Sequence, residues 1–401
     1  MGASHWRACT LGDLLEIKHG FAFKGEFFSD VGPFVVLTPG NFRENGGLKL
    51  KGDKEKFYAG AYPPEYLLKQ GDLLVAMTDL TQHAPILGSP AVIPADGLFL
   101  HNQRLGKVVN VVQHELAYEF LFYLMNANSV RAQIKGSATG STVRHTSPSR
   151  IYNVAVQLPP LAEQRRIASI LSAYDELIEN NQRRIKILES MTRAIYREWF
   201  VDFRFPGHES VPFVASGHGA IPKGWEASTL GNLVALRKGR SITKDIVRAG
   251  NIPVVAGGTS PAYFHDTSNT NGPVITVSAS GANAGFVNLY FMDVWASDCT
   301  FVDSKTTPHV LYYYLWLDHH RAAITNLQRG SAQPHVYPKD LAMLEALDVP
   351  ETQLVAFRLQ VEPLFNLMSR LTNTVENLRR TRDLLLPRLI SGELDVAEFA
   401  A

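Results

Sequence analysis

The chain has 401 residues and a formal net charge of +1, with 39 lysines and arginines against 38 aspartates and glutamates. Hydrophobic residues make up 45% and charged residues 19%, an ordinary globular balance that excludes a disordered or collagen-like chain. The longest strongly apolar stretch, residues 310–317, is too short for a membrane-spanning helix, which needs about 20 such residues. Two cysteines are too few for a disulfide framework, and residues 1–6 lack a secretory pattern. We therefore expect a cytoplasmic protein of two or three domains that has no membrane association.

The first part of the chain is rich in short β-type runs bounded by Gly, Pro and Asn. Residues 34–37 and 72–77 are such runs, and a helical pattern follows over residues 115–125. Together they predict a compact α+β domain, which we bound at residues 1–157. Its last part has no acidic residue between Phe120 and Ala162, and the cations there are Arg131, Lys135, Arg144 and Arg150. This segment is either a solvated face or a local nucleic-acid-binding patch.

A long helix is predicted next, within residues 158–204. Residues 162–200 contain no Gly and no Pro. Apolar side chains recur there every seven residues, a pattern typical of a coiled-coil seam, the buried stripe along which two helices pack. The seam positions are Ile167, Leu171, Tyr174, Ile178, Asn181, Ile185, Leu188 and Ile195.

The same order of segments then recurs, which indicates a tandem duplication. Thr10-Leu11-Gly12-Asp13 recurs as Thr229-Leu230-Gly231-Asn232, Gly136-Ser137-Ala138 as Gly330-Ser331-Ala332, and Leu158-Pro159 as Val349-Pro350. β-type runs at residues 253–255 and 274–278 and a helical pattern at 309–326 predict a second α+β domain over residues 205–348.

A second long helix is predicted within residues 349–401. Its seam positions are Phe357, Val361, Leu364, Met368, Leu371, Val375, Leu378 and Leu385. Pro363 should kink or restart this helix near its first turns. Since each helix has a single seam, we expect the two helices to pack on each other and to act as a spacer between the two sheet-rich domains.

Several of these segments resemble one known family. Residues 158–168 (LPPLAEQRRIA), continuing through 179–185 (ENNQRRI), resemble the central conserved region of the specificity subunit of type I restriction–modification systems. The runs at 196–204 (YREWFVDFR) and 71–79 (GDLLVAMTD) are also typical of that family. The order domain–helix–domain–helix extends the resemblance over essentially the whole chain.

The resemblance implies an α+β fold class, with two target-recognition domains separated by a pair of long antiparallel helices. It also implies a DNA-binding subunit that catalyses nothing and holds no cofactor of its own. Two modification subunits, which bind S-adenosylmethionine and methylate adenine, would dock on it. Restriction subunits, with a motor and nuclease that use ATP and Mg, join such complexes. The second conserved region, residues 349–353, lacks two residues relative to the first, so partner contacts there are less secure.

Absent motifs independently favour a non-catalytic chain. A phosphate-binding loop needs Gly-x-x-x-x-Gly-Lys-[Ser/Thr], whereas Gly20 to Gly25 is followed by Glu26. Tyr62-Pro63-Pro64-Glu65 has the two prolines of an amino-methyltransferase loop but neither flanking residue. The histidines show no metal-ligand spacing. Two alternatives remain open: a coiled-coil protein-interaction scaffold that binds no nucleic acid, and a fused single-chain enzyme, which the absent motifs disfavour.

Candidate DNA contacts are polar side chains able to read base edges and cations able to bind phosphate. In the first domain they fall into four clusters: Lys18, His19 and Lys24; Thr78, Asp79 and Thr81; His101, Asn102 and Arg104; and Ser137, Ser141, Thr142, Arg144 and His145. The matching residues of the second domain are Arg237, Lys238, Arg240 and Lys244; Ser278, Ser280 and Asn283; and Arg329, Ser331, Gln333 and His335. Mobile polar loops and solubilising charges are the alternative interpretation.

Overall fold

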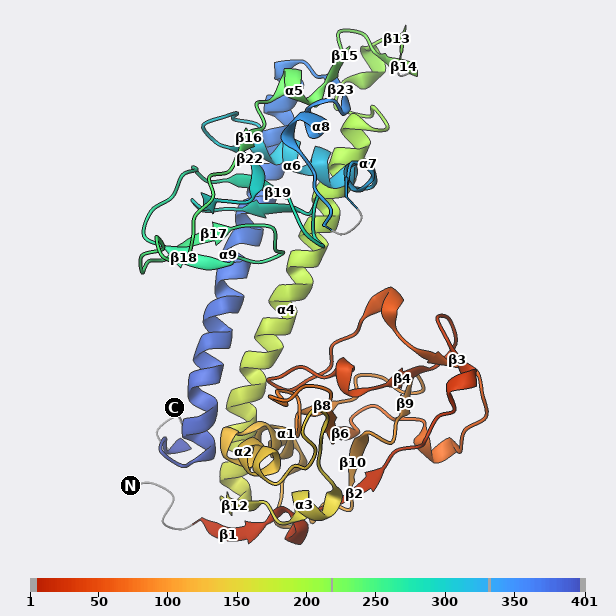
Figure 1. Ribbon diagram of the computed structural model, residues 1–401, viewed down its shortest axis with the longest axis vertical. Coiled ribbons are helices and arrows are strands. Elements are labelled where there is room, and N and C mark those ends of the chain that lie inside the picture. Colours follow the sequence, from red (N-terminus) through yellow and green to blue (C-terminus); the bar gives the residue numbers. More distant parts are fainter. Residues whose placement is uncertain (1–5, 218, 331–332, 397–401) are drawn as a thin grey trace. The chain divides into compact units, whose positions relative to one another are not determined.

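The computed structural model describes residues 6–217, 219–330 and 333–396, and the chain divides into two compact units (Figure 1). Unit 1 holds the described residues of Met1–Glu179 and Glu376–Ala401, and unit 2 holds those of Asn180–Val375. Two helices of 40 residues, α4 (Leu161–Phe200) and α9 (Glu351–Ile390), each contribute residues to both units. In the described part of the chain, no helix is long and apolar enough to cross a membrane. The boundaries at residues 157, 204 and 348 stay predictions.

The first domain, in unit 1, contains two four-stranded sheets. One is antiparallel with the strand order β2-β10-β6-β8, and the other has the order β3-β5-β4-β9 with β4 and β9 parallel. Two further pairs, β1–β12 and β7–β11, complete the strands. The strands are β1 (Arg7–Thr10), β2 (Glu16–His19), β3 (Phe28–Ser29), β4 (Val35–Leu37), β5 (Phe57–Tyr58), β6 (Leu73–Ala76), β7 (Thr78–Asp79), β8 (Pro90–Val92), β9 (Phe99–His101), β10 (Leu105–Val109), β11 (Arg144–His145) and β12 (Ala155–Leu158). The helices are α1 (Tyr118–Asn126), α2 (Asn128–Gly136) and α3 (Pro148–Tyr152).

The second domain, in unit 2, has a four-stranded sheet β16-β22-β19-β20 and a three-stranded sheet β18-β17-β21 in which β17 and β21 are parallel. The strand pairs β15–β23 and β13–β14 lie outside these sheets. The strands are β13 (Phe213–Ser216), β14 (Gly219–Pro222), β15 (Glu226–Thr229), β16 (Arg237–Lys238), β17 (Ile252–Val255), β18 (Tyr263–His265), β19 (Val274–Ser278), β20 (Val287–Tyr290), β21 (Trp295–Ala296), β22 (Cys299–Asp303) and β23 (Glu345–Asp348). The helices are α5 (Leu230–Leu233), α6 (Val310–His319), α7 (Arg321–Asn326) and α8 (Pro338–Ala342).

The two domains share one topology, which confirms the predicted duplication. The sheet β2-β10-β6-β8 has its counterpart in β16-β22-β19-β20, and the parallel pair β4–β9 in β17–β21. In each copy the first strand pairs with the last strand, as β1 with β12 or β15 with β23, and the last strand is followed by a 40-residue helix. The predicted strand runs at residues 34–37, 72–77, 253–255 and 274–278 correspond to β4, β6, β17 and β19.

Two of the tripeptide and dipeptide matches are out of register. Gly330 corresponds to Gly140 rather than to Gly136, because both have φ near 93° and each follows a residue that exchanges two backbone hydrogen bonds with a histidine. Those exchanges join Thr139 to His145 and Arg329 to His335. At the long helices, α4 begins one residue after Pro160 and α9 one residue after Pro350, so these two prolines are the true counterparts. Short sequence identities are weaker guides to register than a paired turn.

The predicted seam is confirmed in both units. In unit 1, Ile167 and Leu171 of α4 are buried in one apolar cluster with Leu389 and Ile390 of α9. An ion pair of 2.5 Å joins Asp175 to Arg382 two turns further along. In unit 2, Leu188 belongs to one cluster with Phe357, Val361 and Met368. Because residue numbers rise along one helix as they fall along the other, the helices run antiparallel within each unit.

Pro363 does not restart the second helix, so that part of the prediction is wrong, and the kink stays a prediction. α9 is continuous from Glu351 to Ile390. A proline inside a helix removes the hydrogen bond to the carbonyl four residues earlier, here that of Leu359. The Leu359 side chain is 64% exposed and Pro363 is exposed as well, so water reaches this carbonyl. The missing hydrogen bond therefore lies on the solvent side, where its loss is tolerated.

We expect Phe357→Ala to destabilise the protein by about 3–5 kcal/mol, since this ring is fully buried among Trp199, Phe200 and Tyr312. Leu359→Ala, on the solvent side of the same helix, should change the free energy of unfolding by less than about 0.5 kcal/mol. Denaturant unfolding of the two variants measures both values. Equal losses would show that the seam does not carry the stability of unit 2.

Candidate DNA interface

Strand pairing brings two of the predicted clusters of the first domain together. β7 and β11 are antiparallel, with Asp79 opposite Arg144 and Thr78 opposite His145. The amide of Thr146 donates to the carbonyl of Met77 (2.9 Å), which extends the same ladder. The acid-free loop and the residues after β6, separated by some 60 positions in the sequence, therefore lie side by side.

The other two clusters of this domain are joined to the first two. The amide of Phe21 donates to the carbonyl of His101 (2.8 Å), and the amide of Gln103 donates to the carbonyl of Phe21 (3.0 Å). The amide of Met77 donates to the carbonyl of Arg104 (3.0 Å), which links this pair to the strand before Thr78. All four clusters thus belong to one hydrogen-bonded group of strand ends and loops.

The second domain repeats this gathering with different residues. Ser280 and His335 form a β-bridge, and the amide of Gly281 donates to the carbonyl of Pro334 (3.0 Å). Cys299 of β22 lies opposite Ser278 and its carbonyl accepts from Gly239 (2.8 Å), next to Lys238. The structure therefore brings the predicted residues of each domain together within that domain.

Most of the predicted contact residues are exposed to solvent. Sixteen are exposed: Lys18, His19, Lys24, Thr81, Arg104, Ser137, Ser141, Thr142, His145, Arg237, Lys238, Arg240, Lys244, Asn283, Arg329 and Gln333. Four are half-buried: Asn102, Arg144, Ser280 and His335. Ser331 lies outside the described residues.

Thr78, Asp79, His101 and Ser278 are buried, and the expectation that they touch DNA needs correction. Oγ1 of Thr78 is hydrogen-bonded to Nδ1 of His145 (3.1 Å). Nε2 of His101 donates to the carbonyl of Leu105 (2.9 Å), and burial lowers the pKa of this imidazole to about 4. Oγ of Ser278 donates to the carbonyl of Gly257 (3.0 Å), and Asp79 accepts hydrogen bonds from its own loop. These four side chains support the fold instead of facing a ligand.

Two of the predicted cations are held by the protein itself. Nη2 of Arg144 donates to the carbonyls of Lys135 (3.1 Å) and Ala138 (3.4 Å) at the end of α2. Arg329 forms an ion pair of 2.8 Å with Asp340. Among the described residues, the exposed cations that have no salt bridge and remain for phosphate contact in these clusters include Lys24, Arg104, Arg237, Lys238 and Arg240.

Three exposed side chains near the clusters of the two domains were not among the predicted contacts. In the first domain, Leu80 directly after β7 is 59% exposed, and His83 of the same loop is exposed. Tyr337, 43% exposed, stacks on His335 with ring centroids 5.9 Å apart. Their position one to four residues from predicted contacts was the available signal. In the described part of the chain, no three His, Cys, Asp or Glu side chains come together in a way that would hold a metal ion.

Comparison with known proteins decides the family. A family model described as the type I restriction modification DNA specificity domain matches residues 3–190 and 222–353. The chain belongs to this family. The role of the family is DNA target recognition, and the chain is a non-catalytic specificity subunit of the type I restriction–modification class. The two matched segments are the two copies of the repeat.

Individual relatives agree with this assignment. The chain is 26% identical over 341 residues to the type I restriction enzyme MjaIX specificity subunit of Methanocaldococcus jannaschii, covering 80% of this chain and 78% of that protein. It is 27% identical over 194 residues to the EcoBI specificity subunit of Escherichia coli, covering 47% of this chain and 37% of that protein. The crystal structure of a type I restriction–modification S subunit from M. genitalium matches with a TM-score of 0.62 at 18% identity over 96% of both chains, which shows a shared fold.

The buried His101 predicts a pH dependence of stability. The pKa of His101 in the folded domain lies below the unfolded value of 6.5. Between these two values the imidazole is protonated in the unfolded chain and neutral in the folded domain. The free energy of unfolding therefore falls as the pH drops from 6.5 towards 4. In His101→Gln a side-chain amide replaces Nε2 as the donor to Leu105 and does not titrate. We expect this variant to lose less stability over that window, by about 2–3 kcal/mol, in urea unfolding at a series of pH values. His83→Gln, an exposed control, should follow the wild type. Parallel curves for all three proteins would contradict a buried neutral His101.

Proposed function

We propose that this specificity subunit recognises an interrupted, bipartite DNA target, with each α+β domain reading one half-site. The observation that carries the proposal is the recurrence of one surface in both domains with different side chains at matching positions. His145 and His335 correspond, whereas Thr139 is replaced by Arg329. Because base edges are read by the identity and placement of polar side chains, two such surfaces read two different sequences.

The chemistry of the exposed residues supports double-stranded DNA as the ligand. Ser137, Ser141, Thr142 and Asn283 present hydrogen-bonding groups, and Arg104 has the planar fork that pairs with guanine or phosphate. The exposed lysines and arginines at β16 and after β2 supply phosphate contacts, which position a protein on the duplex without reading its sequence. The net charge of +1 makes these local cations the main source of electrostatic affinity.

The partners we propose are two modification subunits, which bind S-adenosylmethionine and methylate adenine. Restriction subunits that use ATP and Mg join the complex where they are present, and the whole assembly acts in the cytoplasm. Support for a protein partner comes from α4, where a shallow groove is lined by Arg183, Lys186, Ile187, Ser190, Met191 and Ala194. Ile187 is 53% and Met191 44% exposed, and apolar side chains exposed together on one surface are typical of a protein-binding site.

Domain exchange tests the reading of half-sites. Replacing residues 1–157 with the first domain of another family member should change one half of the target and leave the other half as it was. Mapping methylated adenines in DNA treated with the complex of chain and modification subunits measures both halves at once. A change in both halves would contradict independent reading, and a chain that contributes no DNA binding to the complex would favour the scaffold.

Met191→Arg tests the docking face on α4. A cation placed in an apolar contact loses hydration without a partner, so we expect affinity for the modification subunit to fall at least about tenfold. Met343→Arg is the matched control, because Met343 is 73% exposed and lies outside the long helices. Titration calorimetry compares the two variants, and thermal unfolding checks that both remain folded. Equal affinities in the two variants would place the docking face elsewhere.

A further inference from the structure

The loop between β7 and β8 has an exposed tip on a buried base. Leu80, Thr81, Gln82 and His83 are exposed, whereas Ala84, Leu87 and Gly88 are buried. The tip adjoins His145 and the acid-free loop through the β7–β11 pair. Its side chains include an apolar group that fits the thymine methyl and an amide that fits adenine.

A buried carboxylate fixes both ends of this loop. Asp79 is 2% exposed. Its Oδ1 accepts from the amide (2.9 Å) and hydroxyl (2.8 Å) of Thr81, and its Oδ2 accepts from the amide of Ile86 (2.8 Å). Three donors satisfy the buried charge, as a buried carboxylate requires. Loss of one oxygen acceptor would release one end of the loop.

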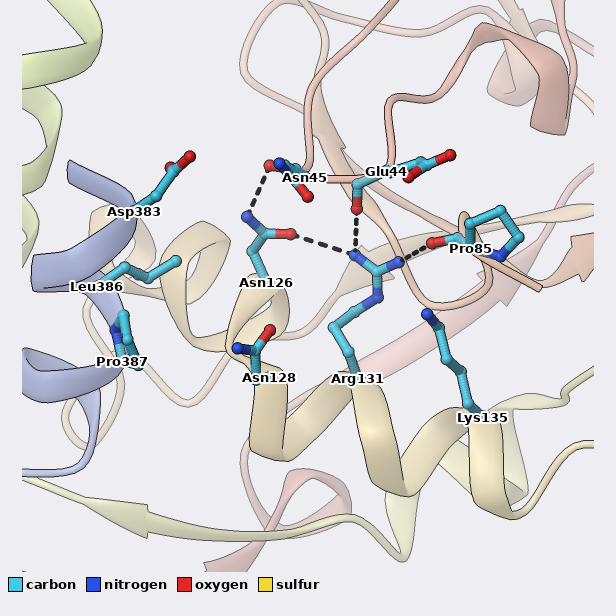
Figure 2. Close-up of a pocket in the computed structure, with 10 residues that line it drawn as sticks. All are labelled: Glu44, Asn45, Pro85, Asn126, Asn128, Arg131, Lys135, Asp383, Leu386 and Pro387. Carbon is cyan, nitrogen blue, oxygen red and sulfur yellow. Dashed lines mark hydrogen bonds between the residues drawn. The ribbon is translucent and has the colours of Figure 1, made fainter. Parts of the chain in front are cut away.

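A buried guanidinium holds the loop from the other side. Arg131 of α2 is 6% exposed. Its Nη2 donates to the carbonyl of Pro85 (2.7 Å) and its Nε to that of Leu87 (3.0 Å). Its Nη1 donates to the carbonyl of Glu44 (3.0 Å) and to Oδ1 of Asn126 (3.2 Å), which ties in a second loop (Figure 2). The Arg131 side chain thus fixes the backbone at two residues of the loop base, Pro85 and Leu87.

The backbone between these two anchors is strained. Ala84 has φ of 46°, in the left-handed region that residues other than glycine avoid. Such conformations are unfavourable and persist only where the surroundings fix them. The surroundings here are Asp79, which accepts hydrogen bonds from Thr81 and Ile86 on either side of Ala84, and Arg131, which donates to the carbonyls of Pro85 and Leu87.

The second domain lacks this arrangement. Gly88 and Gly285 each lie against an isoleucine, Ile134 and Ile324, so Arg131 and Arg321 occupy matching positions three residues earlier. Arg321 is exposed and pairs with Asp318 at 2.5 Å. Ser280 pairs with His335 as Thr78 pairs with His145, so the place of Asp79 is taken by Gly281, which has no carboxylate. The buried anchors are therefore specific to the first domain.

We propose that Asp79 and Arg131 are positioning residues that hold Leu80–His83 as a rigid reading loop for the first half-site, with Leu80 and Gln82 as base contacts. A loop that is ordered before binding loses little conformational entropy in the complex. Because it cannot rearrange, its hydrogen-bond donors and apolar group are left without partners when the base is wrong, and binding is weakened. This inference rests on the proposed function and names which residues determine one half of its specificity.

The test measures how well the full chain, assembled with its modification subunits, discriminates between the intact target and targets with one mismatched base. Binding to duplexes with one base changed in the first or the second half-site is compared with binding to the intact target. A single mismatch typically costs 1–3 kcal/mol, about 5- to 150-fold in affinity. Asp79→Asn places an amide N–H₂ against a backbone N–H, so we expect its penalty for first-half mismatches to fall at least about fivefold. Its penalty for second-half mismatches should stay as in the wild type.

Further variants separate positioning from simple destabilisation. Leu80→Ala and Gln82→Ala remove tip side chains without touching the base, and each should lose discrimination at one base pair only. Asp79→Asn combined with Gln82→Ala should discriminate at that base pair no worse than Gln82→Ala alone, because Asp79 acts through the tip. Arg131→Gln should repeat the Asp79→Asn result, and Arg321→Gln is its matched control. If Arg131→Gln fails to fold, Asp79→Asn and the tip variants still decide.

The outcomes are distinct. Unchanged first-half discrimination in folded Asp79→Asn, or an equal loss at both half-sites, overturns the positioning role. Additive losses in the double variant also overturn it. A wild-type complex that shows no sequence preference overturns the proposed function itself, independently of these variants.

Discussion

The antiparallel contact between α4 and α9 is the constraint on which both halves of the protein depend. In unit 1 the beginning of α4 is buried against the end of α9, and in unit 2 the end of α4 is buried against the beginning of α9. Each domain adds its own helix to this seam. Tyr123 of α1 donates to Asp175 (2.8 Å), which also pairs with Arg382, and Tyr312 of α6 packs on Phe200. Neither helix buries its apolar stripe without the other, so the two copies of the repeat are coupled in folding.

The two copies stabilise the start of their long helices by different chemistry. Gln164 is fully buried, accepts from the amide of Ala117 (2.8 Å) and donates to the carbonyls of Glu115 and Pro159. Leu354 takes its place in α9, and the polar contact there is His309 with Glu351 (2.9 Å) in the first turn. A carboxylate at a helix N-terminus is favourable, and a buried glutamine that uses both its groups is equally satisfied. The two copies thus begin their long helices with different polar contacts at corresponding places in one fold.

The sequence predicted the periodic features well and the single-residue features poorly. Seven-residue recurrence identified both long helices, since a seam repeats its signal over many turns. No repeated pattern predicts whether the side chain of Asp79, at the end of its strand, faces solvent or accepts hydrogen bonds from its own loop. The tripeptide match at Gly330 failed for a similar reason, because an identity of three residues carries less information than the paired turn around Gly140. The expected restart at Pro363 is wrong because Pro363 lies off the seam, where the missing hydrogen bond faces solvent.

The charge of the chain bears on how it achieves specificity. Non-specific DNA affinity comes from cations that release counterions, and here Arg131, Arg144 and Arg329 are engaged with carbonyls or a carboxylate of the protein. With a net charge of +1 and these three cations engaged, we expect one domain alone to bind DNA weakly at physiological salt. Under the proposed function, tight binding then requires both domains to engage on one duplex, where the second contact benefits from a high effective concentration. We therefore expect a correct half-site beside a wrong one to be poorly bound, which would make weak electrostatic affinity in each domain a source of selectivity for the complete target.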